Sequence, residues 1–147
     1  MRGLLQRVRR AAVRVAEEEV GAIAAGVLLL VGFAPDDTPE RAEVLLDRVL
    51  RYRLFADAEG RMNRSLVDTG GGLLIVSQFT LLADTRKGLR PSFTPAAPPA
   101  QARALYDHLV AVAQARHQPV ASGVFGADMQ VELVNDGPVT LLLDVPG

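Results

Sequence analysis

Cysteine is absent from the 147-residue sequence, and histidine occurs only twice. Without cysteine there is no disulfide, no thiol nucleophile and no cysteine-ligated zinc site. This composition is compatible with a reducing compartment, and we expect a cytoplasmic protein. Nothing in the sequence pairs His108 and His117 as metal ligands or as a catalytic base, so we expect both to be surface residues.

Long hydrophobic runs and the common catalytic motifs are also missing. The longest apolar run, Val27 to Val31, is far too short to cross a bilayer. Arginines interrupt the N-terminal segment, so we expect no signal peptide. There is no P-loop, no G-x-S-x-G elbow and no metal-binding cluster. We therefore expect no membrane association, no metal and no cofactor.

An enzyme made from these residues would have few chemical groups to use. Hydroxyls, an amide and backbone N–H groups can stabilise the oxyanion of a tetrahedral intermediate. They are poorly suited to generating a strong nucleophile without a neighbouring base. Any hydrolysis would therefore depend partly on groups that the substrate itself supplies.

The net charge of −1 creates no global field that would attract nucleic acid. Lys87 is the only lysine among the 16 cationic residues, and the others are arginine. Arginine suits bidentate contacts with phosphate. An arginine-rich genome composition explains the same bias at least as well.

Length and pattern predict one domain, residues 1–147, of the α/β (α+β) class. Thr38 as N-cap and Pro39 at the first position begin an amphipathic helix, and a second helix runs from Ala102 to Arg116. We expect a mixed β-sheet or partial barrel with these two main helices. The predicted strands are 4–15 (as one or two strands), 27–33, 51–55, 73–80, 120–125, 129–134 and 139–145.

The stretch from Gly70 to Phe93 is the most informative part of the chain. Three glycines precede an apolar strand that we expect to be buried on both faces, and Ser77, Gln78 and Thr80 follow in it. A period of two predicts Gln78 and Thr80 on one face, with Ser77 and Phe79 on the other. The following basic loop, 85–90, makes an anionic substrate plausible. A core strand with locally satisfied hydroxyls remains the alternative.

The last part of the chain predicts a hairpin. Residues 129–134 alternate strictly, and Asn135-Asp136-Gly137-Pro138 has the composition of a turn before a final strand. A proline directly after Asp-Gly is unusual, because it removes a donor where the returning strand should begin pairing. The Gly137–Pro138 bond is therefore a candidate for the cis form.

Two motifs in this order resemble those of the D-aminoacyl-tRNA deacylase family of the bacterial and eukaryotic type. Residues 77–80 match S-Q-F-T, and residues 135–140 match N-x-G-P-x-T. The similarity covers nearly the whole chain and departs from neither motif. Further matching segments are Gln6–Val8, Tyr52–Phe55, Asp57–Asn63, Arg90–Phe93 and Phe125–Met129.

The resemblance implies a homodimer with its site at the subunit interface. The dimer would hydrolyse the ester between the 3′ end of tRNA and a D-amino acid, or glycine mischarged on tRNA-Ala, as chiral proofreading in translation. The implied catalytic residues are Ser77, Gln78, Phe79 and Thr80. Thr80 could be a nucleophile. Alternatively, the terminal 2′-hydroxyl of the tRNA provides activation, while N–H groups near Phe79 and Thr80 hold the carbonyl. The second mechanism suits this sequence better, because no base adjoins Thr80.

The second motif is implied to select the substrate. Gly137 and Pro138 would reach into the partner's site and exclude L-side chains by a clash, and Asn135 belongs to the same motif. Arg7 would hold this segment in place. The remaining implied contacts are Phe125 and Met129 beside the terminal adenosine. An enzyme that grips mainly the RNA end needs a local cationic rim, for which Arg86, Lys87 and Arg90 are candidates.

Two other functions fit the residues without the resemblance. A non-catalytic module could bind RNA ends with the same arginines. A plain esterase or amidase could act on small metabolites. The first predicts tRNA binding without turnover, and the second predicts hydrolysis of D-amino-acid esters without tRNA.

Overall fold

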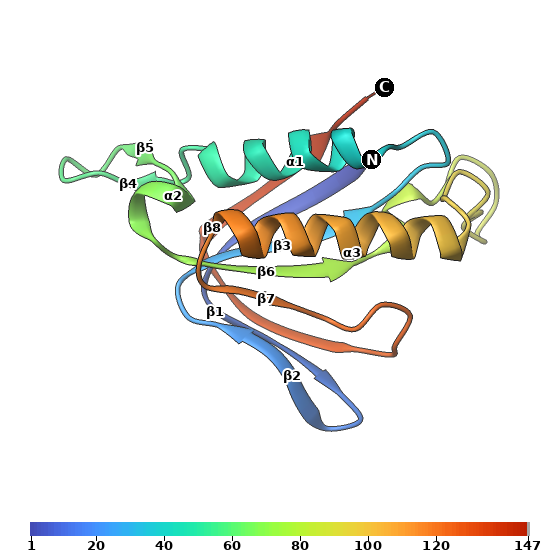
Figure 1. The fold of residues 1–147 in the computed structure, drawn as a ribbon, viewed down its shortest axis with the longest axis horizontal. Helices are drawn as coiled ribbons and strands as arrows, with labels where there is room; N and C mark the ends of the chain where they lie inside the picture. The colour runs from blue at the N-terminus through green and yellow to red at the C-terminus, as the bar shows by residue number, and fades with distance from the viewer. Residues whose placement is uncertain (147) are drawn as a thin grey trace.

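A curved, mixed β-sheet with two long helices against one face forms the body of the protein (Figure 1). The computed structural model describes residues 1–146. In this range the helices are α1 (Pro39–Arg51), α2 (Leu66–Thr69) and α3 (Pro99–Arg116), with one 3₁₀ turn, η1 (Phe79–Leu82). The strands are β1 (Arg2–Val15), β2 (Glu18–Ile23), β3 (Gly26–Gly32), β4 (Phe55–Ala56), β5 (Met62–Arg64), β6 (Gly72–Ser77), β7 (Val120–Ser122) and β8 (Gln130–Asp144).

The long first strand makes the sheet curl. Strand order is β2-β1-β3-β6-β7, and β8 pairs with β1 along its other edge. The first half of β1 pairs with β3, whereas its second half pairs with β2. Because one strand serves both neighbours, the sheet turns back over itself as in a partial barrel (Figure 1). The predicted mixed sheet with two main helices in one domain is confirmed.

Strand β6 is buried on both faces, as its apolar run predicts. It lies between β3 and β7 and is parallel to both. Leu73 and Ile75 belong to the core under α1 and α3, and Leu74 and Val76 belong to the core inside the curled half of the sheet. Full burial of each such side chain contributes about 2 kcal/mol to stability. Both cores thus hold the strand that carries the S-Q-F-T motif.

The two predicted helices form as expected, with an additional short one. The Thr38 hydroxyl accepts a hydrogen bond from the N–H of Arg41 at 3.2 Å, which confirms the N-cap of α1. Helix α3 begins at Pro99, three residues before the predicted start. Helix α2 was missed, although Ser65 and Asp68 form a capping box at its start. In residues 1–146 no helix combines the length and apolar character that a membrane span requires.

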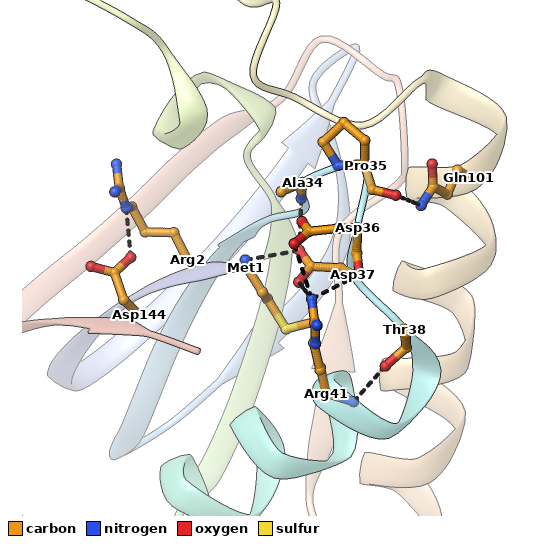
Figure 2. A network of polar contacts seen from close by, with 10 residues as sticks. All are labelled: Met1, Arg2, Ala34, Pro35, Asp36, Asp37, Thr38, Arg41, Gln101 and Asp144. Carbon is orange, nitrogen blue, oxygen red and sulfur yellow. Dashed lines mark hydrogen bonds and ion pairs between the residues drawn. The ribbon is translucent and has the colours of Figure 1, made fainter. Parts of the chain in front are cut away.

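A buried polar cluster joins the start of β1 to the loop before α1 (Figure 2). Asp37 accepts from the amino group of Met1 at 2.8 Å and from the N–H of Ala34 at 2.7 Å. Its side chain is almost fully buried. Arg41 reaches the same cluster from the first turn of α1. A buried carboxylate needs such partners. The cluster therefore holds the loop between β3 and α1 in place.

An ion-pair cluster connects α1 to α3. Glu43 accepts from His108 Nε2 at 3.0 Å and from Arg116 Nη2 at 2.8 Å. Nε2 of His117 lies 2.6 Å from the Gly71 carbonyl oxygen. Both histidines are half-buried and have polar partners, so the expectation of plain surface residues was wrong in this respect. The hydrogen bond from His108, followed by the charge of Arg116, lowers the pKa of Glu43.

Replacing Glu43 by glutamine is expected to lower the melting temperature at neutral pH. The folded-state pKa of Glu43 is below 4.5, so its contribution is present above that pH and is lost as the pH falls through the lowered value. Thermal melts of both proteins between pH 3 and 7 test this. The difference between them should shrink below about pH 4. A difference that stays constant across this range would contradict the ionic interpretation.

The predicted hairpin at residues 135–138 is wrong, because β8 continues through this segment without reversing. Both halves of β8 pair antiparallel with β1. Between the pairs Gln6–Thr140 and Val8–Asn135, residues 136–139 of β8 lie opposite the single residue Arg7 and form a bulge. Local turn composition was outweighed by pairing with a single long strand. The sequence also did not predict strand β2, because its glutamates are typical of a solvated surface segment. Of predicted strand 51–55, only Phe55 lies in a strand, and β7 ends at Ser122.

Candidate active site

Only the first residue of the S-Q-F-T motif, Ser77, lies in a β-strand. Strand β6 ends at Ser77, and the N–H of Gln78 donates to the Val31 carbonyl at 2.8 Å. The chain then tightens into η1, where Leu81 N–H donates to the Gln78 carbonyl at 3.2 Å. The predicted two-face alternation of residues 77–80 is therefore wrong. The tight turn instead leaves Phe79 and Thr80 exposed at the end of the strand.

Two backbone donors at the start of η1 are unused. The first N–H groups of a helical turn have no partner within it. Within residues 1–146, the N–H groups of Phe79 and Thr80 donate to no other residue. The Gln78 side-chain amide donates to the Thr80 hydroxyl, and a donor of this kind cannot remove a proton. This arrangement can hold a carbonyl oxygen but does not activate Thr80.

A cavity of about 690 Å³ opens beside η1. Its first wall contains the edge-to-face pair of Phe79 and Phe93, whose ring centroids are 5.0 Å apart. Phe125 and Met129 line it from the segment between β7 and β8. Aromatic walls of this kind can stack a nucleobase. The other lining residues are Val76, Ser77, Gln78, Thr94, Ala96–Pro99, Ala102, Gly126–Asp128 and Val131.

Helix α3 supports the Phe125 wall through Tyr106. The Tyr106 hydroxyl donates to the Ile75 carbonyl at 2.7 Å, and its ring lies 5.9 Å from that of Phe125. Burial raises the pKa of Tyr106 to about 12, so the hydroxyl remains protonated and can donate at neutral pH. The Arg103 guanidinium lies 5.9 Å from the Phe125 centroid. This wall is consequently held from behind by α3.

The Gly-Pro segment is braced by its own motif and by Arg7. Asn135 accepts from Val139 N–H at 3.0 Å and donates to the Thr140 hydroxyl at 2.9 Å. Arg7 donates to the Asp136 carbonyl at 2.9 Å and to the Leu54 carbonyl at 2.5 Å. The oxygen and the nitrogen of the Asn135 side-chain amide thus both form hydrogen bonds to the residues that follow Pro138.

The tip of this braced segment is exposed. The Gly137–Pro138 peptide bond is cis, and Gly137 has φ +137°, in the region that favours glycine. Both residues are exposed. Gly137 and Pro138 are therefore free to contact another molecule.

The two motifs are not brought together within one chain. Ser77 pairs with Val31 near the end of β3, whereas the Gly-Pro bulge lies beside Val8, which pairs with Gly26 at the start of β3. The motifs are also three strand positions apart in the sheet. About four residues along the strand and three strand spacings across give a separation of roughly 20 Å measured along the sheet. Accordingly, neither Gly137 nor Pro138 lines the cavity beside η1.

The expected cationic rim of Arg86, Lys87 and Arg90 contains fewer unpaired charges than the sequence suggests. Arg86 donates to both carboxylate oxygens of Asp84, at 2.9 and 2.8 Å. These hydrogen bonds lower the pKa of Asp84 to about 2, so the arginine charge is neutralised at neutral pH. Lys87 and Arg90 are exposed and form no ion pair within residues 1–146. Only these two can supply unpaired charge from this loop.

The described residues 1–146 contain no group of three or more His, Asp or Glu side chains arranged to hold a metal ion. Sequence reasoning gave no role to Phe93, Thr94 or the Pro98–Pro99 wall. No periodic pattern could have placed them, because they follow an irregular proline-rich segment. The Arg90–Phe93 match was the one available signal.

Comparison with known sequences matches residues 4–144 to the family described as D-Tyr-tRNA(Tyr) deacylase. A D-aminoacyl-tRNA deacylase of Pseudomonas entomophila (strain L48) is 63% identical over 145 residues, covering 99% of this chain and 100% of that protein. One of the same name from Azotobacter vinelandii (strain DJ / ATCC BAA-1303) is 64% identical over 144 residues, covering 98% and 99%.

Solved structures share the fold. A structure titled c-Myc DNA Unwinding Element Binding Protein superposes with a TM-score of 0.95 at 37% identity, covering 100% of both chains. A structure titled as a probable eukaryotic D-amino acid tRNA deacylase gives a TM-score of 0.85 at 21% identity, covering 98% of both, which supports the fold alone. Since the family match spans nearly the whole sequence, the chain belongs to the D-Tyr-tRNA(Tyr) deacylase family.

Proposed function

We propose that the protein hydrolyses the ester bond of D-aminoacyl-tRNA, and of glycyl-tRNA mischarged on tRNA-Ala, releasing the free amino acid and tRNA. The family match over residues 4–144 is the observation that carries this proposal. The cavity beside η1 supports it, because aromatic walls and two unused N–H groups suit a terminal adenosine and an ester carbonyl. Its place of action would be the cytoplasm, where charged tRNA is used.

The chemistry that we propose does not use Thr80 as a nucleophile. The N–H groups of Phe79 and Thr80 would hold the developing oxyanion, and the 2′-hydroxyl of the terminal adenosine would assist the attack of water on the ester carbonyl, with the 3′-oxygen of the adenosine as the leaving group. The Thr80 hydroxyl has an amide donor as its neighbour and no base, so it cannot readily lose its proton. Substrate assistance supplies the group that the chain lacks.

Chiral selection would come from a second copy of the chain. The Gly-Pro segment is exposed and roughly 20 Å from the S-Q-F-T turn of its own chain, so it could reach the turn of a partner. Within residues 1–146, β8 pairs only along the edge facing β1, and its other edge is open. We propose a homodimer in which Gly137 and Pro138 enter the partner's cavity and exclude L-side chains by a clash.

Binding to nucleic acid without turnover is the main alternative, and one solved relative is named for binding a DNA element. Extended binding of this kind needs a row of unpaired cations. Here most arginines near the sheet surface pair with carboxylates, as Arg10 and Arg14 do with Glu132. Recognition limited to an RNA end requires fewer charges, which favours the deacylase proposal.

Hydrolysis of matched D- and L-tyrosyl-tRNA, with a chelator present, tests the proposal directly. Rapid loss of the D-ester alone would support deacylation at a metal-free site. Decay of both esters at the spontaneous rate would reject the activity and favour binding without turnover. Hydrolysis of free D-tyrosine esters at comparable rates would instead indicate a small-molecule esterase.

Replacing Thr80 by valine is expected to leave kcat for D-tyrosyl-tRNA within about tenfold of wild type. Valine keeps the branched shape and the backbone N–H while removing the hydroxyl. Loss of a true nucleophile would instead reduce the rate by about 10⁴-fold or more. Single-turnover hydrolysis distinguishes the two outcomes. Both proteins should hydrolyse a matched D-tyrosyl-tRNA that ends in 2′-deoxyadenosine much more slowly than the normal substrate.

A further inference from the structure

The S-Q-F-T turn lies directly on the end of the β1–β3 ladder, where Arg2 and Gly32 are register partners. Gln78 joins the turn to this ladder through its N–H bond to Val31. Neither Arg2 nor Gly32 lines the cavity, and neither belongs to the two family motifs matched above. Arg2 nevertheless donates to the Leu81 carbonyl of η1, and Gly32 lies against Gln78 and Leu82 at the two ends of the turn.

Gly32 allows the turn to approach the sheet. A Cβ atom at this position would lie 2.8 Å from the Gln78 carbonyl oxygen and 2.4 Å from Leu82 Cδ2. The Gln78 oxygen is backbone and accepts the first hydrogen bond of η1, so it cannot move independently of the turn. Any side chain larger than hydrogen would therefore lift η1 away from β3.

Arg2 holds the other end of the turn. Its Nη1 donates to the Leu81 carbonyl at 3.0 Å. Its Nε donates to Asp144 at 2.8 Å, as Figure 2 shows, and the Asp144 carbonyl in turn accepts from Arg48 at 3.1 Å. Carbonyls at the end of a helical turn lack partners within it, so a guanidinium is well suited to this place. The end of β8 thereby fixes the arginine that holds η1.

We propose that Gly32 and Arg2 are positioning residues for hydrolysis: Gly32 sets the height of η1 above the sheet, and Arg2 sets its tilt. This inference rests on the proposed function, in which the N–H groups of Phe79 and Thr80 hold the ester oxygen. Such donors must keep their place within about 0.5 Å, and a displacement of 1 Å can cost about 100-fold in rate. Binding of the RNA end, which also depends on the walls outside η1 at Phe93, Phe125 and Met129, should change less.

The test measures kcat and KM for D-tyrosyl-tRNA together with the backbone amide NMR shifts of residues 79–82. Gly32→Ala is expected to lower kcat by about 100-fold, and Arg2→Met by about tenfold, with KM within about threefold in both. Both variants should shift the amides of residues 79–82. Arg2→Lys, which can reach only one of the two acceptors, should recover part of the lost kcat.

Arg14→Met is the matched control. Arg14 also pairs a β1 guanidinium with a β8 carboxylate, Glu132, at 2.8 Å, but at the end of β1 far from η1. It should leave both kcat and the amides of residues 79–82 unchanged. Unshifted amides in Gly32→Ala and Arg2→Met, or a kcat equal to that of the control, would overturn the inference.

The two readouts keep this inference separate from the proposed function. If the wild type hydrolyses no D-tyrosyl-tRNA, the proposed function fails, while the amide shifts still decide whether the two residues position the turn. If Arg2→Met does not fold, Arg2→Lys takes its place, and its kcat must then fall between those of wild type and Gly32→Ala.

Discussion

Gly26→Ala is expected to be strongly destabilising for this chain. Gly26 and Gly72 face each other where β3 and β6 begin to pair, and a Cβ at position 26 would lie 1.9 Å from the Gly72 carbonyl oxygen. No rotamer change relieves a clash with backbone. The strands would have to separate, which loses ladder hydrogen bonds and opens both cores. We expect a cost of about 3 kcal/mol or more.

Thermal melting and soluble yield measure this effect. For a chain of this length, about 3 kcal/mol corresponds to a fall of about 10 °C in Tm. Gly3→Ala is the matched control, because its Cβ would meet only the flexible ends of Leu29 and Leu45, at 3.1 and 3.2 Å. The control should lose much less stability. A Gly26→Ala protein that melts within a few degrees of the control would contradict the close approach of β3 and β6.

Local signals in the sequence were sufficient for the two long helices and the central strand. Thr38-Pro39 and the apolar spacing that follows are short-range features, and they predicted α1 correctly. The continuous apolar run at 73–76 likewise predicted a strand buried on both faces. Such features depend on each residue's own conformational preference and on burial, so they can be read without knowing the partner strand.

Errors occurred where long-range pairing overrode local composition. Asp136-Gly137 has a typical hairpin composition, yet both flanking segments pair with β1 and the chain does not reverse. Gln78 and Thr80 were placed in a strand, but Gly32 provides room for a tight turn to pack on β3 instead. A residue 46 positions earlier in the chain thus decides the shape of the motif, and no local pattern contains that information.

In the candidate site, too, some residues could be predicted from the sequence and others could not. Motif residues 77–80, Phe125 and Met129 could be named from the resemblance, and all of these except Thr80 line the cavity beside η1. Phe93 and Arg2 could not be identified, because their roles follow from contacts across the fold. The distance between the two motifs also has no signature in the sequence. That separation is the reason why the proposed chiral selection assigns Gly137 and Pro138 to the site of a second chain.

Replacing Gly137 by alanine is expected to weaken chiral selection more than it weakens folding. A Cβ at this position would lie 2.8 Å from Val139 Cγ2 and 3.0 Å from Arg7 Nη2, and φ +137° disfavours any L-residue. The braced loop must shift, so the tip that we propose to exclude L-side chains would move. We expect the D-to-L ratio of kcat/KM for tyrosyl-tRNA to fall at least about tenfold, equivalent to about 1.4 kcal/mol.

Gly60→Ala separates this effect from backbone strain alone. Gly60 also has a positive φ, +82°, but a Cβ there would meet no atom within 4 Å. Both variants should lose about 1 kcal/mol of stability, whereas only Gly137→Ala should lose selectivity. If selectivity falls equally in both variants, or falls only in step with the unfolded fraction, Gly137 serves the fold and not the choice of enantiomer. A selective loss at position 137 would instead make the exposed Gly-Pro tip the feature that rejects L-aminoacyl-tRNA, because Gly60→Ala also places an L-residue at a positive φ but meets no neighbouring atom.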